Sequence, residues 1–397
     1  MLLKKKNMEK KPFAGARATY KDRIFKHKLR VLYRVALVAA VVFGVTLFIK
    51  IQIDNRVYKE AEVMDKLKKN GTAESTYEKY NGNLLVHSKD GISAYDLTGT
   101  QMWNQTYEMQ DPIVKVNGNY VAAGDYRGST LYIMNEKGIQ SEVDTNLPIQ
   151  DIAISQKGVV AVVLADTDTT WIRLYSSEGE VIANNKTTMN QSGYPLAVSI
   201  SPDNIKLGVS FLKSQGGQIN TSVAFYNFGD VGQNKGDHLV SGFDFEETVI
   251  PYLEYVNETD AFALSDSKLL VFKGKQIPSL DVKVKIKEEV QSVYHDESHL
   301  ALVYADPEGK SKYRLDLYDL AGKKIMSADF DMEYTDILLS NGNIIIYNAA
   351  DVLIMNTKGL VKYRGDLGGD IQTLIPTESA TKFLVIKSED MEIMRLH

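Results

Sequence analysis

The chain has no cysteine among its 397 residues and only nine prolines. The absence of cysteine excludes disulfides, thiolate catalysis and zinc or iron–sulfur sites built on cysteine. A bacterial envelope protein made without a disulfide pathway fits such a composition. The scarcity of proline beside 22 tyrosines favours strands over low-complexity linkers. With 44% hydrophobic and 24% charged residues, most of the chain is expected to be globular.

Basic charge is concentrated at the amino terminus. Between Met1 and Arg34 there are twelve lysines and arginines and two acids, a net charge of +10. The whole chain carries −5, which leaves −15 for the remainder. A basic tail and an acidic body suggest different compartments. An acidic body also argues against nucleic-acid binding, because phosphate contacts need clustered lysines and arginines.

One long apolar run follows the basic tail. Val35–Ile49 carries no charge, and Ile51 and Ile53 extend the stretch to residue 53. A helix over residues 35–53 spans roughly 28 Å at ~1.5 Å per residue, close to the hydrocarbon thickness of a bilayer. The alternatives are a cleaved signal peptide, which lacks a small-residue cleavage site here, and a buried core helix, which the basic flank disfavours. We expect a cytoplasmic tail (1–34), a transmembrane helix (35–53) and an extracellular C-terminal domain.

The segment after the apolar run has helical spacing. Arg56–Lys69 contains good helix formers, with apolar residues at three- or four-residue steps, and Asn70-Gly71 offers a helix stop. The sequence therefore predicts a helical stalk over 54–72, and assigns 73–397 to the exported domain.

From about Ser75 onward the pattern changes to alternating apolar and polar residues with frequent turns, which is typical of strands. One element recurs: an apolar strand ends in an aromatic residue or methionine, and a small polar residue and a glycine follow. Its spacing averages about 43 residues, the length of a four-stranded propeller blade. Five anchors carry the full element: Tyr95, Met134, Tyr175, Tyr318 and Met355. Weaker copies stand at Tyr226, Phe272 and Met394, which makes eight anchors.

These repeats predict an all-β domain, a β-propeller of eight blades with seven as the alternative. A ring of blades buries both faces of each sheet, and its closure removes exposed sheet edges. The last repeat has room for three strands only, and a strand at Ser75–Tyr80 is expected to complete it. Two stacked β-sandwiches are the rival architecture, but sandwiches do not require such regular anchors.

Two stretches resemble known propeller repeats. Ala94–Trp103 (AYDLTGTQMW) is similar to the repeat of quinoprotein-like propellers, although only this copy contains the tryptophan. Ser201–Leu207 (SPDNIKL) resembles the Ser-Pro-Asp-Gly-Lys turn of several propeller classes, with Asn204 in the glycine position. Both likenesses bear on fold and say little about activity.

A closer resemblance is to an uncharacterised bacterial family of membrane-anchored, propeller-like proteins. It covers roughly Ser75 to the end of the chain. The resemblance implies the propeller architecture and the membrane location, but that family has no assigned activity and transfers no site. The segments that carry it are Gly193-Tyr194-Pro195, Ser201-Pro202-Asp203, Phe225–Gly229 and Val231–Asn234.

No catalytic constellation emerges from the sequence, and no cofactor or metal is predicted. His295 and His299 form the only close histidine pair, but their spacing differs from the helical zinc motif and predicts a solvated hairpin. Asp166-Thr167-Asp168 resembles the start of a calcium loop but lacks its glycine and distal glutamate. A cofactor-dependent dehydrogenase is disfavoured because only one good quinoprotein-like copy is present.

Acidic residues recur where the first strand of a blade is expected to begin. Because the innermost strands line the central channel of a propeller, these acids could ring its mouth and attract a cation or a cationic ligand. The alternative is that aspartate simply caps these turns. The candidate ligand-binding residues are Asp111, Asp151, Asp336 and Asp370, with Tyr194 nearby.

The anchor, the propeller pattern and the missing motifs together predict a non-catalytic platform of the bacterial cell envelope that binds proteins or ligands. Its expected partners are the lipid bilayer, through the transmembrane helix, and an envelope protein or cell-wall component. The alternative is an enzyme or small-ligand sensor at the channel mouth, for example one acting on cell-wall carbohydrate.

Overall fold

The computed structural model describes residues 20–397, except for 73, 189–190, 216 and 306–310. The chain divides into two compact units, Met1–Arg56 and Val57–His397. The prediction for the first nineteen residues of the basic tail lies outside the described residues.

The first unit contains the helix α1 (Tyr20–Asp54). Within its part from His27 to Asp54, an 18-residue stretch has a mean hydropathy of 2.3, and in the described residues this is the one helix long and apolar enough to cross a membrane. Its large apolar side chains are exposed, with Leu37 at 66% and Phe43 at 69%. Between Val35 and Ile49 no residue is charged, so this part of α1 is apolar on all sides, as expected for a helix surrounded by lipid.

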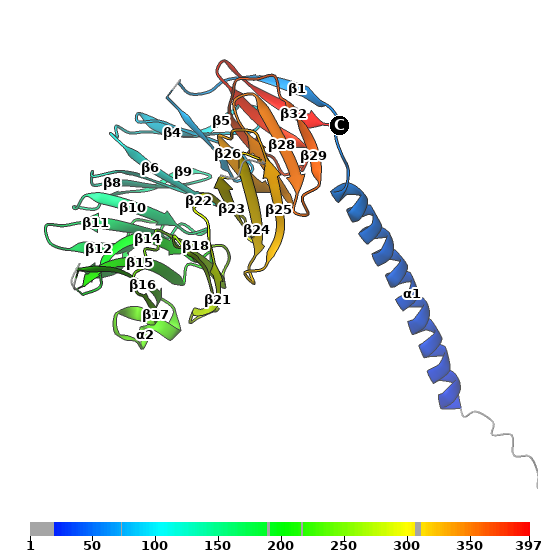
Figure 1. Cartoon of the computed structure of the whole chain (residues 1–397), viewed down its shortest axis with the longest axis horizontal. Helices are drawn as coiled ribbons and strands as arrows, with labels where there is room; N and C mark the ends of the chain where they lie inside the picture. Colours follow the sequence, from blue (N-terminus) through cyan, green and yellow to red (C-terminus); the bar gives the residue numbers. More distant parts are fainter. Residues whose placement is uncertain (1–19, 73, 189–190, 216, 306–310) are drawn as a thin grey trace, which may run out of the picture. The chain divides into compact units, whose positions relative to one another are not determined.

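The second unit is an eight-bladed β-propeller. In the described part of the chain, the strands form eight antiparallel four-stranded sheets (Figure 1). The first four blades follow one another along the chain. Blade 1 holds β2 (Thr76–Tyr80), β3 (Asn83–His87), β4 (Gly91–Tyr95) and β5 (Gln101–Thr106); blade 2 holds β6 (Pro112–Asn117), β7 (Tyr120–Asp125), β8 (Thr130–Asn135) and β9 (Gly138–Asp144); blade 3 holds β10 (Ile149–Ile154), β11 (Val160–Ala165), β12 (Thr170–Tyr175) and β13 (Val181–Thr187); blade 4 holds β14 (Tyr194–Ile200), β15 (Lys206–Gln215), β16 (Gln218–Asn227) and β17 (Leu239–Phe245).

The last four blades repeat this order, except that the final blade takes its outermost strand from the start of the domain. Blade 5 holds β18 (Tyr252–Tyr255), β19 (Asp260–Leu264), β20 (Lys268–Lys273) and β21 (Ser279–Lys285); blade 6 holds β22 (Val290–His295), β23 (His299–Ala305), β24 (Tyr313–Asp319) and β25 (Lys324–Phe330); blade 7 holds β26 (Asp336–Ser340), β27 (Asn343–Tyr347), β28 (Asp351–Asn356) and β29 (Val361–Asp366); blade 8 holds β30 (Ile371–Pro376), β31 (Lys382–Lys387), β32 (Asp390–Leu396) and β1 (Ala61–Lys68).

The core consists of apolar layers between neighbouring blades. Each of eight clusters of buried residues joins two adjacent blades. The cluster that joins blade 8 to blade 1 contains Tyr77 and Leu84 from blade 1 and Ile375 and Leu384 from blade 8. Each blade therefore buries both faces, and the ring is closed.

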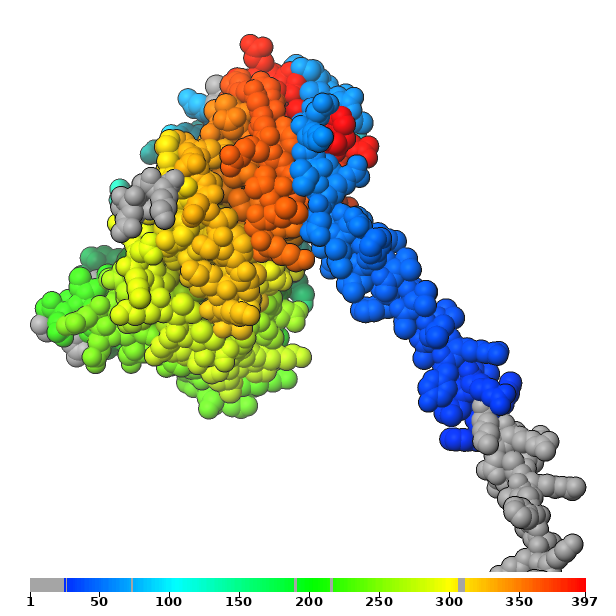
Figure 2. Space-filling model, turned by 45° about the vertical axis from the view of Figure 1, so that its right-hand side comes forward, coloured from blue at the N-terminus to red at the C-terminus, as the bar shows by residue number. Residues whose placement is uncertain are grey.

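The predicted helical stalk over 54–72 is wrong. The helix α1 ends at Asp54, and β1 pairs with β32 from Ala61↔Leu396 to Lys68↔Asp390. Figure 2 shows the blue residues of this segment against the red residues of the C-terminus. The free edge of β32 offers unpaired backbone groups, and pairing with them outweighs the moderate helix propensity of this segment. The propeller therefore includes β1, and does not begin at residue 73.

The strand expected to complete the last blade is also different. Thr76–Tyr80 forms β2, the innermost strand of blade 1, and β1 completes blade 8 in its place. Eight blades, the first of the two predicted numbers, is the number observed.

The repeated turn between the third and fourth strands has a clear physical basis in blade 1. The carboxylate of Asp96 accepts hydrogen bonds from the backbone nitrogens of Thr98 and Thr100, both at 2.9 Å. Gly99 has a φ of +83°, which glycine adopts without strain. Four residues later, Trp103 packs edge-on against Tyr80, with ring centroids 5.9 Å apart. The motif thus reverses the chain and supplies an aromatic residue to the core.

Blade 4 departs from this short turn. Its third and fourth strands are joined by the helix α2 (Asp230–Gln233) and the 3-10 turn η1 (Gly236–His238). Gly232 leaves no room for a side chain, because an added Cβ would lie 1.6 Å from the carbonyl oxygen of Asn227. The insertion follows the anchor Tyr226, whereas the longest spacing between anchors, from Tyr175 to Tyr226, contains the ten-residue strands β15 and β16.

Candidate binding site in the central channel

The innermost strand of each blade faces the centre of the ring. These strands are β2, β6, β10, β14, β18, β22, β26 and β30. Successive side chains of a strand point to opposite faces, and each face is turned toward a different neighbouring blade. In β10, for example, Ile152 and Ile154 are buried in the core layer between blades 2 and 3. Asp151 lies on the opposite face of the strand and lines a cavity.

Four inner strands from blades 2–5 enclose a cavity of about 280 Å³. Its polar lining includes Lys115 of β6, Asp151 of β10, Ser199 of β14 and Glu254 of β18. The hydroxyl of Ser199 donates to Oε1 of Glu254 at 3.0 Å, and its oxygen accepts from the backbone nitrogen of Tyr255 at 2.9 Å. Ser199 therefore holds the carboxylate of the neighbouring blade in place.

The carboxylates of this cavity are poorly solvated. Burial raises the pKa of Glu254 to about 7; the hydrogen bond from Ser199 and the positive charge of Lys115 oppose this rise, and the negative charge of Asp151 adds to it. Burial likewise raises the pKa of Asp151, although its bond from the backbone nitrogen of Ile152 (2.8 Å) favours the charged form. Such shifted groups inside a cavity are typical of functional sites.

A second cavity of about 630 Å³ adjoins the first, since Val116 and Asn117 line both. It lies against blades 1, 2, 7 and 8, and Asp336 of β26 is one of its lining residues. The carboxylate of Asp336 accepts from the backbone nitrogen of Ile337 at 2.8 Å, the same local bond that Asp151 makes. Burial raises the pKa of Asp336 as well.

The predicted site residues are thus separated by the structure. Asp151 and Asp336 line different cavities of the channel. Burial raises the pKa of Tyr194, and the charges of Tyr126 and Asp151 add to this rise. Asp111 and Asp370 are exposed and line neither cavity. The carboxylate of Asp370 accepts from the hydroxyl and the backbone nitrogen of Ser388 at 2.8 and 3.2 Å, as a turn-capping residue does. The four acids therefore do not form a single ring.

Residues 54–396 match the family described as "Family of unknown function (DUF5711)". The chain belongs to this family. No curated protein sequence matches it.

Among solved structures, the chain is similar to BamB from Moraxella catarrhalis, with 11% identity and a TM-score of 0.51 over 85% of this chain and 100% of that one. It is also similar to a structure described as the eukaryotic initiation factor, with 11% identity and a TM-score of 0.52 over 83% of each chain. Apo AztD from Citrobacter koseri shows 10% identity and a TM-score of 0.51 over 76% of this chain and 88% of that one. At such identities the likeness shows the propeller fold alone.

Sequence reasoning on this DUF5711 chain missed Lys115, Ser199 and Glu254. Each is a single polar residue within a short apolar strand, in the segments Val-Lys-Val, Val-Ser-Ile and Leu-Glu-Tyr. That pattern is a usable signal, because an inner strand tolerates a polar side chain only where it faces the channel. Which blades bring such residues together depends on the ring and not on the local sequence.

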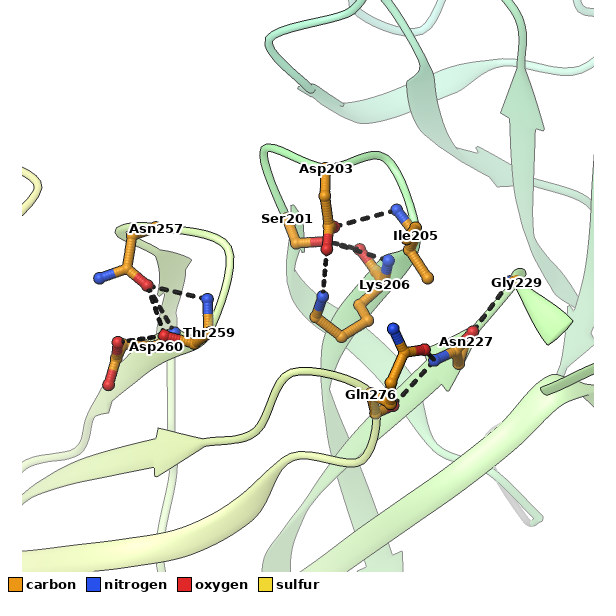
Figure 3. A network of polar contacts seen from close by, with 10 residues as sticks. All are labelled: Ser201, Asp203, Ile205, Lys206, Asn227, Gly229, Asn257, Thr259, Asp260 and Gln276. Atoms are coloured by element: carbon orange, nitrogen blue, oxygen red, sulfur yellow. Dashed lines mark hydrogen bonds and ion pairs between the residues drawn. The ribbon is translucent and has the colours of Figure 1, made fainter. Parts of the chain in front are cut away.

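The Ser-Pro-Asp turn of this family member is structural. Figure 3 shows Lys206, whose side chain is fully buried, with its Nζ 2.8 Å from Oδ2 of Asp203. Burial disfavours the charged form of Asp203, but the hydrogen bonds from Lys206, Ser201 and Ile205 outweigh it and lower the pKa of that carboxyl. Asn204 adopts a φ of +67°, which explains its place in the glycine position of the turn.

Neighbouring turns in the same view serve the backbone in a similar way. The side-chain oxygen of Asn257 accepts from the backbone nitrogens of Thr259 and Asp260, both at 2.8 Å (Figure 3). The amide nitrogen of Asn227 donates to the backbone oxygen of Gln276 at 2.8 Å and so joins blade 4 to blade 5.

The histidine pair lies in the turn between β22 and β23. The carboxylate of Asp296 accepts from the backbone nitrogens of Ser298 and His299, and Nδ1 of His299 lies 3.1 Å from it. The ring of His295 packs edge-on against Phe262, and burial lowers its pKa. Among the described residues, no group of three or more histidines and acids could hold a metal ion.

The Asp166-Thr167-Asp168 stretch is the turn between β11 and β12. The carboxylate of Asp166 accepts from the backbone nitrogen of Thr167 at 2.7 Å and from Nε1 of Trp171 at 3.5 Å. These bonds lower its pKa and hold it in the turn.

Proposed function

We propose that the protein is a non-catalytic binding platform of the bacterial cell envelope, held at the membrane by α1 and exposed to the outside. The observation that supports this most strongly is the short covalent link between the helix and the propeller. A helix long and apolar enough to cross a membrane ends at Asp54, and the strand that closes the propeller begins seven residues later, at Ala61. The propeller is therefore tethered by the same segment that completes its ring.

The ring offers its ligand a pre-formed recess. The two adjoining channel cavities are lined by strands whose backbones are fixed in four-stranded sheets, so binding there costs little ordering. Lys115, Asp151 and Glu254 provide charges of both signs around one of them. Concave sites of this kind with a few convergent polar groups are the usual binding sites of proteins.

The location is tested by cysteine accessibility. The chain has no native cysteine, so Asp168→Cys, in an exposed turn of blade 3, introduces a single reactive thiol. The matched control is Lys6→Cys in the basic tail. A membrane-impermeant maleimide applied to intact cells is expected to label the first variant only. If intact cells are labelled at position 6, and position 168 is labelled only after lysis, the proposed location is refuted.

Binding is tested by photocrosslinking in intact cells. A benzophenone amino acid replaces Tyr194, at the start of β14 beside the channel, and in a control replaces Val181, which is 55% exposed on an outer strand. A platform that binds through its channel side is expected to capture the same adduct repeatedly from position 194. No adduct above that of position 181 would count against this function.

A second candidate is a sensor of small ligands or an enzyme acting in the channel. The cavity lined by Lys115, Asp151 and Glu254 favours it, because it brings two carboxylates and one ammonium group to a single space. Asp151→Asn with Asp336→Asn removes one carboxylate from each cavity. Under this alternative the double variant loses response to the ligand while its unfolding midpoint stays unchanged, and an unaltered response would exclude the alternative.

A further inference from the structure

A groove of about 740 Å³ lies between blade 5 and blade 6, outside the channel cavities already described. Its floor is apolar and includes Val249, Leu264, Ile286 and Val293. Val249 is 39% exposed, whereas Ile286 is almost fully buried at 5%, so the groove has both an accessible lip and a rigid base. Its shape and apolar floor suit the side chains of an extended segment.

The groove continues into the channel. Pro251 and Tyr252 line both the groove and the 280 Å³ cavity. The ring of Tyr252 stacks on Phe262 with centroids 5.3 Å apart, which fixes it between the two spaces. Glu254 follows two residues later on β18, so it faces the same side of that strand. A single ligand could therefore occupy the groove and reach the carboxylate of Glu254.

The charges along this path are predominantly negative. The groove is bordered by Asp266, Glu288 and Glu289, with Lys287 as the one cation among its lining residues. Glu288 is paired with Arg314 at 2.8 Å. Within the described part of the chain, Asp266 and Glu289 take part in no salt bridge, and the same is true of Glu254. Unpaired carboxylates beside an apolar floor favour a ligand that is both cationic and apolar.

We propose that the groove and the adjoining channel cavity bind an extended peptide segment of an envelope protein. Its apolar side chains occupy the groove, its basic side chains face Asp266 and Glu289, and a primary ammonium group reaches Glu254. An anionic lipid headgroup would be repelled by the same carboxylates. The assignment rests on the proposed function, because it names the partner class of that platform.

The ammonium group can come from the amino terminus of the peptide or from a lysine side chain, and the probes separate these sources. The full chain is placed in nanodiscs of phosphatidylcholine, a zwitterionic lipid that does not attract basic peptides. The probe is a heptapeptide of alternating leucine and lysine with a free amino terminus and a fluorophore at its carboxyl end. A second probe is acetylated at the amino terminus, a third has every lysine replaced by glutamine, and a fourth has every lysine replaced by glutamate. Fluorescence anisotropy gives the Kd, and empty nanodiscs give the background.

Two variants test the assigned residues. Glu254→Gln keeps the shape but removes the charge, and is expected to weaken binding at least about tenfold, as the loss of a hydrogen bond to a charged group does. Glu289→Lys reverses a charge at the rim, and a smaller loss of about threefold is expected because solvent screens it. Glu180→Lys, an exposed carboxylate in blade 3, is the matched control and should leave the Kd unchanged.

A loss of affinity on acetylation that exceeds the loss on replacing the lysines by glutamine assigns the ammonium group to the amino terminus. Binding that survives acetylation but fails for the glutamine probe assigns it to a lysine side chain, and both results support the proposal. Equal binding of the glutamate probe, or a Kd unaffected by Glu254→Gln, would overturn it. Extracellular labelling at position 168 without peptide binding would refute this inference alone, whereas peptide binding with cytoplasmic labelling would refute the envelope location alone.

Discussion

The residue that best tests the closure of the ring is Tyr58. It precedes β1, is only 7% exposed, and packs in the cluster between blades 7 and 8 with Ile345, Tyr363 and Phe383. Its backbone nitrogen also donates to the carbonyl oxygen of Lys362 at 2.7 Å. If residues 54–72 were a free helical stalk, none of these contacts would exist, and replacing Tyr58 would leave the stability of the propeller unchanged.

The structure predicts a large effect instead. Truncation of a buried aromatic side chain to alanine typically costs about 3–5 kcal/mol, from lost transfer free energy and the cavity left behind. We therefore expect Tyr58→Ala to lower the free energy of unfolding by about 3 kcal/mol. The adjacent Val57 is 57% exposed, so Val57→Ala should change it by less than about 0.5 kcal/mol.

The two variants are compared in urea with the full chain in detergent micelles. The chain contains two tryptophans, Trp103 in blade 1 and Trp171 in blade 3, and their fluorescence reports unfolding of the ring far from the substitution. A shift of the midpoint with Tyr58→Ala but not with Val57→Ala is the expected result. Equal midpoints for both variants would refute the assignment of this segment to the propeller.

Other predictions concern two turns and the channel, each measured by urea unfolding. Asn204→Gly should stabilise the domain by about 0.5–1 kcal/mol, because glycine adopts the φ of +67° without strain; a loss of stability would contradict this. Asp203→Ala should cost about 3–5 kcal/mol, because it leaves the fully buried Lys206 unpaired, whereas a cost below about 1 kcal/mol would show that Lys206 finds water or another partner. Burial raises the pKa of Glu254 from 4.5 to about 7, so the native state binds more protons than the unfolded state between these values, and stability must fall as the pH rises through that window. Glu254→Gln should remove up to about 3 kcal/mol of this loss, and equal pH dependence of the variant and the unmodified chain would contradict the assignment.

The channel brings together charged groups from strands that lie far apart in the chain. Lys115, Asp151 and Glu254 belong to three different blades. Each is a polar residue in an inner strand. Their proximity follows from the order of blades around the ring. Burial is the main cause of the raised pKa of Glu254; the positive charge of Lys115 opposes the rise and the negative charge of Asp151 adds to it.

Local patterns in the sequence determined the repeating part of this protein. The turn motif, a capping polar residue followed three positions later by glycine, acts within five residues. Its five clear copies and three weaker ones predicted eight blades, with seven as the alternative, without any knowledge of contacts. The apolar run predicted a helix able to cross a membrane for the same reason, because composition and length suffice for it. Asp151 and Asp336 could also be recognised, since each begins or lies within an inner strand.

Only the tertiary structure decided how the ring closes and where its charges meet. Arg56–Lys69 carries a helical spacing, and its extended form depends on the open edge of β32 more than three hundred residues away in the chain. Asp370, like Asp151, is followed by an isoleucine of an inner strand, but it caps the turn between β31 and β32, because Ser388 of that turn lies within hydrogen-bonding distance. Pairing across a sheet edge and packing across a channel are long-range interactions, and no local pattern of residues encodes them.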